Sequence, residues 1–285
     1  MDKKISQLIG ATTPLTGTEE IAIVQGGSTV KATAQDVADL AGGIIVEGAG
    51  TNSTLRVGLN NSAGGASSTC LGDSNSASGN YSTIGGGDTN LATAERATIA
   101  GGSQNEIPLN SNYSTIGGGI LNRASGLFSG ILGGSAGVAN RYGQRSWANG
   151  AFFDAGDSQQ IDLVARTKTT TATPTNLWLN GFNARITISS GFTLFATVNV
   201  AGIKSDGSSA AHYIRKVAIK NVGGTTSLIG TVSTIGTDVE DNAGYDVTIT
   251  ADNTNDALDI KVTGATGETI RWTAHIQGVE IKYGT

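Results

Sequence analysis

Aliphatic residues recur at a short and nearly constant interval between about Ser68 and Trp147. Steps of 14, 15, 17 and 15 residues separate five of them, which we call the anchors: Cys70, Ile84, Ile99, Ile116 and Ile131. A polar turn follows most anchors and carries an asparagine five or six residues further on, at Asn75, Asn90, Asn105 and Asn122. Such self-similarity is typical of a solenoid, in which each unit buries its apolar face against its neighbours. A coil of about 15 residues has room for short strands and tight turns but not for a helix, so the pattern predicts a β-roll.

Glycines follow the anchors in pairs or triplets, as in Gly85–Gly87. They permit positive φ at corners and close approach of neighbouring backbones. Each coil otherwise offers about one Ile and one aromatic residue. Burying an Ile contributes about 1.5–3 kcal/mol, whereas ordering one residue costs about 1–2 kcal/mol. We therefore expect the anchors to find partners on two further copies of the chain, which predicts an obligate homotrimer with Cys70, Ile84, Ile99, Ile116 and Ile131 on its axis.

The phrase Tyr-Ser-Thr-Ile-Gly-Gly-Gly occurs at 81–87 and 113–119, and Asn-x-Ala turns follow it. This pattern resembles the head repeats of trimeric autotransporter adhesins and the collar-like β-rolls of phage tail fibres. The resemblance covers about 80 residues, and it implies an architecture rather than a binding partner. A flexible Gly/Ser-rich linker is the alternative, but a linker does not keep an aliphatic residue in register.

Residues 1–43 are expected to form a compact unit that precedes the roll. Ile21–Gln25 and Thr29–Ala32 predict a hairpin around Gly26-Gly27, and Thr33 is placed to cap a two-turn helix that ends at Gly42-Gly43. The stretch from Ile5 to Leu40 resembles the N-terminal segment of many tailed-phage fibre and baseplate proteins. The resemblance implies that residues 1–43 attach the chain to a tail or baseplate protein. A trimer-capping module without docking is the alternative.

The remaining residues divide into a rod and a tip. Residues 44–157 hold a lead-in strand, the roll and a segment in which Trp147, Phe152 and Phe153 are expected to close the end of the stack. Stacking on a sugar is the competing role for Trp147. In residues 158–285, nine alternating runs separated by turns predict an antiparallel, jelly-roll-like β-sandwich. The runs are 161–165, 176–179, 184–188, 192–204, 212–221, 226–235, 246–250, 258–262 and 270–283.

The segment from Gly202 to Thr226 resembles C-terminal domains of phage tail proteins, cyanophages among them. This resemblance implies that the segment belongs to a virion protein, and it implies no particular reaction or ligand. Composition agrees with a structural role, since 42 of 285 residues are glycine and only 14% are charged. A net charge of −5 without basic clustering gives no support for nucleic-acid binding. The single cysteine, Cys70, allows no disulfide within the chain.

No run of 18 apolar residues is present, so we expect no membrane insertion. The first eight residues lack the apolar core of a signal peptide. We therefore expect synthesis in the cytoplasm of a host cell. The resemblances then place the finished protein in a virion.

Few residues suggest catalysis. The two histidines, His212 and His275, each lie within an expected strand, and no serine occupies a strand–helix elbow. The best acidic cluster runs from Asp238 to Asp246 and could form a solvated turn, a weak Ca²⁺ site or a carboxylate pair of the glycosidase kind. We predict no catalytic residue, no cofactor and no metal, and that the chain is not an enzyme. Whether the loop Asp238–Asp246 holds a cation stays open.

Taken together, the sequence predicts a homotrimeric tail fibre or spike. Residues 1–43 dock to the tail, 44–157 form a stiff rod, and 158–285 form a tip that meets a glycan or protein of the host surface. Aromatic residues that could contact a receptor are Trp178, Phe182, Tyr213 and Tyr245, and none is assigned. The alternatives are a purely structural baseplate or collar component and a polysaccharide depolymerase.

Overall fold

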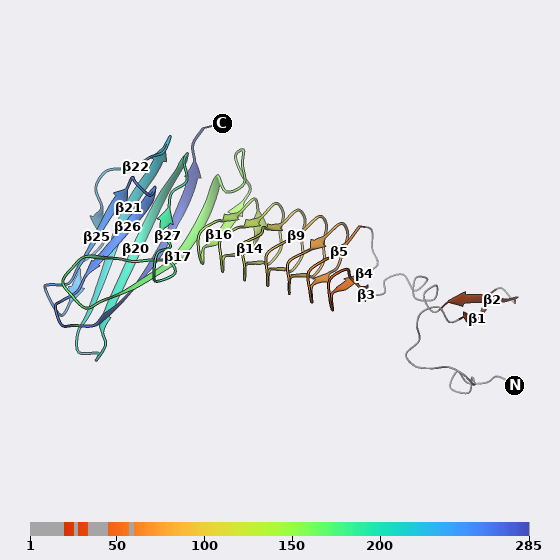
Figure 1. The fold of residues 1–285 in the computed structure, drawn as a ribbon. Helices are drawn as coiled ribbons and strands as arrows, with labels where there is room; N and C mark the ends of the chain where they lie inside the picture. Colours follow the sequence, from red (N-terminus) through yellow and green to blue (C-terminus); the bar gives the residue numbers. More distant parts are fainter. Residues whose placement is uncertain (1–19, 26–27, 34–44, 57–59, 285) are drawn as a thin grey trace.

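A computed structural model describes residues 20–25, 28–33, 45–56 and 60–284. All regular structure in these residues is β-strand, which confirms the predicted all-β class (Figure 1). None of them forms a helix that could cross a membrane. Strands β1 (Glu20–Gln25) and β2 (Ser28–Thr33) pair as the predicted antiparallel hairpin. The short helix expected after Thr33 lies outside the described residues.

The repeat folds into a β-roll, as predicted. Most coils contribute one short strand, usually of two residues, to each of two parallel sheets, and successive coils stack in register, as in Ile84 beside Ile99. The first sheet contains β4 (Thr54–Arg56), β6 (Thr69–Cys70), β8 (Thr83–Ile84), β10 (Thr98–Ile99), β12 (Thr115–Ile116), β14 (Gly130–Ser135) and β16 (Arg145–Asn149). The second contains β5 (Ser62–Ala63), β7 (Ser76–Ala77), β9 (Leu91–Ala92), β11 (Glu106–Ile107), β13 (Arg123–Ala124) and β15 (Val138–Ala139). Strand β3 (Ile45–Glu47) pairs antiparallel with β4 and covers the first edge.

The anchors point into the roll of their own chain. All five are between 0% and 2% exposed within a single copy. They share one core with inward residues of the second sheet, among them Ala77, Ala92 and Ile107. The expectation that the anchors lack partners within their own chain is therefore wrong, and with it the reason for placing them on a trimer axis. That expectation counted one aliphatic residue per coil and overlooked the small residues that face the anchors from the second sheet.

A ladder of buried asparagines runs beside this core. Asn75, Asn90, Asn105 and Asn122 occupy equivalent places in four successive coils and are at most 1% exposed. The Oδ1 atom of Asn90 accepts the backbone N–H of Asn105 at 3.0 Å, and its Nδ2 donates to the carbonyl of Gly102 at 2.8 Å. Each side chain thus satisfies backbone groups of the coils around it, which is the condition for burying an amide. The ladder ties every coil to the next.

Residues 158–284 form two antiparallel sheets around one core. The larger contains β17 (Ser158–Thr169), β27 (Ile270–Lys282), β20 (Phe192–Lys204), β21 (Ala210–Val222) and β22 (Thr225–Leu228), with the short β23 (Ser233–Thr234) and β24 (Val239–Glu240) at its edge. The smaller contains β18 (Thr175–Asn176), β26 (Ala257–Thr263), β19 (Ile186–Thr187) and β25 (Asp246–Asp252). Both sheets contribute to the core, for example Leu163 and Trp272 from the larger and Ile260 from the smaller.

One expected strand differs. The run 226–235 was predicted as a single strand, but it is divided into β22 and β23. Gly230 lies between them with a φ of +71°, a left-handed conformation that ends an extended strand. The divided segment runs along the edge of β21 and pairs with it. Its residues form one wall of a groove that is described below.

The roll and the tip share one continuous sheet. Strand β16, the last parallel strand of the roll, pairs antiparallel with β17, the first strand of the tip. A single 15-stranded sheet therefore runs from the first coil to the far edge of the tip (Figure 1). We call its surface that points away from both cores the outer face.

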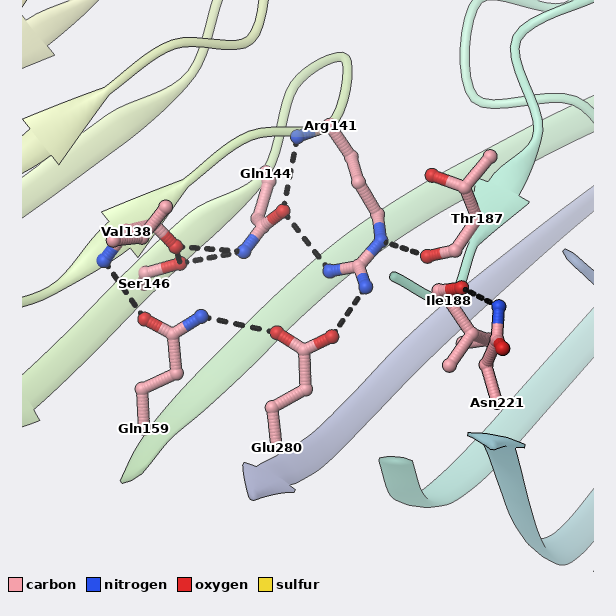
Figure 2. Close-up of polar contacts among 9 residues, drawn as sticks. All are labelled: Val138, Arg141, Gln144, Ser146, Gln159, Thr187, Ile188, Asn221 and Glu280. Atoms are coloured by element: carbon pink, nitrogen blue, oxygen red, sulfur yellow. Dashed lines mark hydrogen bonds and ion pairs between the residues drawn. The ribbon is translucent and has the colours of Figure 1, made fainter. Parts of the chain in front are cut away.

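Buried polar groups lie at the end of the roll, and Figure 2 shows the hydrogen bonds and the ion pair among them. The guanidinium of Arg141 forms an ion pair with Glu280 of β27, and both side chains are 3% exposed. Nε of Arg141 donates to the carbonyl of Thr187 at 2.6 Å, and Nε2 of Gln159 donates to Glu280 at 3.0 Å. The expectation that Trp147, Phe152 and Phe153 plug the end of the stack is wrong, since all three are more than half exposed.

Candidate functional site

Carboxylates of the acidic cluster from Asp238 to Asp246 form hydrogen bonds with side chains of β21 in the same chain. Both oxygens of Asp238 accept hydrogen bonds from Arg215, at 2.6 and 2.7 Å, and this guanidinium holds the pKa of Asp238 below its usual value. The hydroxyl of Tyr213 donates to Glu240 at 2.6 Å. Two of the carboxylates are thus already partnered within the chain. In the part of the chain that the structure describes, no three His, Cys, Asp or Glu side chains gather closely enough to hold a metal ion.

The aromatic residues singled out in the tip have different surroundings. Tyr213 and Tyr245 belong to the core, and burial together with the bond to Glu240 raises the pKa of Tyr213 far above its usual value. The Trp178 ring lies 5.0 Å from the guanidinium of Arg185. Phe182 is 78% exposed in a loop. These residues do not form one site.

A groove does occur where the roll meets the tip, and it arises where the repeat breaks down. A threonine precedes the anchor in four coils (Thr69, Thr83, Thr98 and Thr115), but Gly130 and then Arg145 take this place in the last two. After the anchor, the small residues Gly85, Ala100 and Gly117 are succeeded by Leu132 and Trp147. A shift in register between Ile131 and Gly134 leaves Leu132 88% exposed. The large side chains of Leu132 and Trp147 therefore lie next to Gly117 and Gly130, which have no side chains to fill the space between them.

We call this hollow the junction groove. It has a volume of about 240 Å³ and lies on the outer face over β12, β14, β16 and β17. Its apolar walls come from Leu132 and Trp147, and its polar rim comes from Arg145, Gln160 and Asp162. Asp162 also accepts a hydrogen bond at 2.9 Å from Nε2 of His275 on β27. A few polar groups around an apolar wall are the usual make-up of a ligand site.

A second hollow, the tip groove, lies on the same face further along the sheet. It has a volume of about 490 Å³. Phe195 and Val279 form its apolar floor, Lys216 supplies a positive charge, and Ile229 and Ser233 of the divided segment stand at one side. Side chains in strands alternate between the two sheet surfaces. These residues therefore point away from the core, and Phe195 is 46% exposed.

Strand register joins the two grooves. One row of cross-strand neighbours, which we call the apolar row, consists of Trp147, Gln160, Val279, Phe195 and Ala218. The adjacent row, which we call the polar row, consists of Arg145, Asp162, Gln277, Thr197 and Lys216. Neighbouring strands lie about 4.8 Å apart, so Trp147 and Phe195, three strands apart, are separated by about 14 Å.

The charges of the polar row differ in their surroundings. Within the described residues, neither Arg145 nor Lys216 forms an ion pair. Asp162, by contrast, has His275 as its neighbour. The two ends of the row thus carry cations, and its middle carries hydroxyl, amide and carboxylate groups.

Sequence reasoning reached only part of this site. It identified Trp147 as a possible sugar platform, and the junction groove contains it. It missed Phe195 and Lys216, because nothing in the local pattern shows which strands become neighbours. The break in the repeat at Gly130 and Leu132 was the available signal.

No protein-family model and no curated protein matches the sequence. Solved structures do match, among them a tailspike protein gp49 from Acinetobacter baumannii bacteriophage Fri1, a capsular polysaccharide depolymerase (7% identity, TM-score 0.27, 74% of this chain and 39% of that chain). Two others are the tailspikes of Acinetobacter phage vB_ApiP_P1 (12%, TM-score 0.26, 75% and 49%) and Acinetobacter baumannii phage AM24 (10%, TM-score 0.26, 77% and 54%).

The chain spans between 39% and 54% of the length of these solved chains. They correct one expectation. From the absence of a catalytic signature we predicted that the chain is not an enzyme, but one of the matched structures is a depolymerase. The prediction that this chain is not an enzyme is therefore withdrawn.

Proposed function

We propose that this chain is a tail fibre or spike of a tailed phage and that its outer face contacts the host surface. In this proposal, residues 1–43 attach it to a tail or baseplate protein, residues 44–157 form the rod, and residues 158–285 form a β-sandwich tip. The protein is made in the host cytoplasm and ends in the virion. The observation that carries the proposal is the continuous 15-stranded sheet, which joins a rod to a tip without a hinge.

Rigidity is what such a part requires. Each coil is bonded to the next through strand pairing and through the asparagine ladder. The buried pair Arg141–Glu280 then connects the last coil to β27 of the tip. A tip fixed in this way keeps the orientation of its outer face relative to the rod.

The proposal includes assembly into a homotrimer, now on different grounds from the anchors. Aromatic side chains lie in a column along one corner of the roll, and Tyr113 and Phe128 stack there at 5.0 Å while remaining about half exposed. Self-association would remove such apolar surface from water. Three copies on one rod would also combine three weak sites, because binding of the second and third occurs at a high effective concentration.

Antibodies against the tip test the location. Gold-labelled antibodies raised against this chain should mark the tail region of intact particles in electron micrographs. Labelling confined to the capsid, or found only on free protein in lysates, would contradict the proposal. Preimmune serum is the control.

The role at the host surface needs a second experiment. Added purified chain should compete with particles for adsorption to host cells and slow their attachment. If adsorption is unchanged while labelling marks the tail, the purely structural alternative holds. Release of reducing sugar from host polysaccharide, measured in the same samples, would instead establish a depolymerase.

A further inference from the structure

We propose that the outer face binds a linear polysaccharide laid across the strands, from the junction groove to the tip groove, with a carboxylate-bearing sugar at Lys216. The inference rests on the proposed function, since it names what that face recognises. Its path is set by the two adjacent rows that strand register brings together. Both grooves are formed by members of these rows.

The apolar row supplies two aromatic platforms. One face of a pyranose ring presents C–H groups, which pack against the flat side of an aromatic residue. Trp147 and Phe195 both stand on the outer face and are 51% and 46% exposed. Their separation of about 14 Å is too long for one sugar and suits a short run of linked sugars. The site therefore takes a chain rather than a monosaccharide.

The polar row supplies hydrogen-bonding groups along the same path. Between the strands of the two platforms, Gln277 offers an amide and Asp162 keeps acceptor capacity beyond its bond to His275. Thr197 offers a hydroxyl on the same strand as Phe195. Hydroxyl groups of a sugar can both donate and accept. Side chains on successive strands can thus form hydrogen bonds with successive sugars of one chain.

Charge decides the kind of chain. Lys216 lies in the tip groove without an ion-pair partner among the described residues. A carboxylate next to it would complete a charge-assisted hydrogen bond. Asp162 in the middle of the row repels a second carboxylate there and favours hydroxyl groups. Arg145 lies opposite Asp162 in the register, whereas the neighbours of Lys216 are Thr197 and Ser233. The expected ligand is therefore acidic at the Lys216 end of the bound stretch.

The same features argue against a second copy of this chain as the occupant. The cores of protein interfaces are depleted in lysine, and burying Lys216 and Arg145 without partners would carry a large desolvation cost. A polysaccharide leaves both cations partly hydrated. Copy-to-copy contact is nevertheless one outcome of the test.

The test uses the full chain on an array of uronate-containing and neutral oligosaccharides of four or more units. Wild type should retain at least one uronate-containing oligosaccharide. Trp147→Ala and Phe195→Ala should each weaken binding about three- to tenfold, as expected for loss of one aromatic contact, and the double variant by the product of the two, because the sites are far apart. Lys216→Gln should weaken binding only of uronate-containing oligosaccharides.

Phe182→Ala is the matched control, since Phe182 is exposed but lies off both rows, and it should bind like wild type. The inference is overturned if no oligosaccharide binds, or if the two platform variants bind as wild type does. It is also overturned if the double variant turns an oligomer into monomers, because the face is then a contact between copies. Gold labelling of particles is independent of these results. A labelled tail with an empty array removes the inference and leaves the proposed function.

Discussion

An amide side chain in a protein interior is unfavourable unless it finds hydrogen-bonding partners, yet the roll buries four asparagines in a line. The oxygen of each accepts a backbone N–H, and its nitrogen donates to a glycine carbonyl of the next coil. At the residue scale, the repeat is therefore specified by polar groups as much as by the anchors.

Replacing Asn90 by Ala tests this role. The change leaves the N–H of Asn105 without its acceptor and removes one of the two hydrogen bonds to the carbonyl of Gly102, which also accepts the N–H of Asp88. We therefore expect a loss of about 1–3 kcal/mol in the free energy of unfolding. Urea denaturation measures it. Asn140→Ala is the control, because Asn140 is exposed, and it should change stability by less than about 0.5 kcal/mol. Equal effects of both variants would refute the ladder's role.

Glycine is required at one corner of each coil for two reasons. Gly102 has a φ of +91°, and a Cβ added there would lie 2.1 Å from the carbonyl oxygen of Gly119. Gly102→Ala should therefore cost about 3 kcal/mol or more. Its neighbour Gly101 has ordinary φ and open space, with the nearest atom at 3.9 Å. Gly101→Ala should be neutral or slightly stabilising, and thermal unfolding of the pair separates the two cases.

At the scale of elements, the junction between rod and tip depends on the buried pair Arg141–Glu280. Arg141→Met leaves Glu280 buried without its cation and should destabilise the chain by about 3–5 kcal/mol. The double variant Arg141→Met/Glu280→Leu removes both charges and should recover most of this loss. Denaturant unfolding of both variants measures the difference. A single variant as stable as wild type would show that the junction does not depend on the pair.

The loop between β16 and β17 depends on another buried carboxylate. Burial alone would raise the pKa of Asp157, but backbone N–H groups of Phe153, Phe152 and Asp154 donate to it and bring its pKa below the usual value. A lowered pKa means that the charged form stabilises the fold above the unfolded-state pKa of about 3.9. This contribution is lost as the pH falls through the lower, folded-state value.

We expect Asp157→Asn to melt at a lower temperature than wild type at neutral pH, since an amide replaces one accepting oxygen by a donor. The difference between the two melting temperatures should shrink as the pH falls below about 4. Calorimetry across this range checks it. If the difference in melting temperature between wild type and Asp157→Asn stays constant with pH, the charge of Asp157 does not contribute to stability and only the shape of its side chain does.

How far the sequence predicts these elements depends on how local each one is. The hairpin around Gly26-Gly27 and the coils are specified by neighbouring residues, so the pattern predicts them. The pairing of Phe195 with Val279 joins strands far apart in sequence, and no periodicity specifies it. Ile84 was predicted to be buried against other copies of the chain, but it shares a core with Ala92 of its own chain. This partner was missed, because a small residue gives a weak signal of burial. For the same reason the candidate site was identified only at Trp147.

At the scale of the whole molecule, the open question is the number of copies. Sedimentation equilibrium of the full chain should give three times the 28.8 kDa mass of one chain, and the mass should persist on dilution. A stable single copy is compatible with the buried anchors, and it would remove the homotrimer from the proposal. It would leave the rod and the outer face as described.

Stacking in register has a consequence for length. Each inner coil of the roll pairs with the coil before and the coil after it, and its asparagine and glycine meet equivalent partners in them. Inserting or deleting one whole repeat would therefore move the tip by one strand spacing, about 4.8 Å, while the asparagine ladder and the strand pairing stay continuous. The length of the rod can therefore change in steps of one coil, independently of what the tip binds.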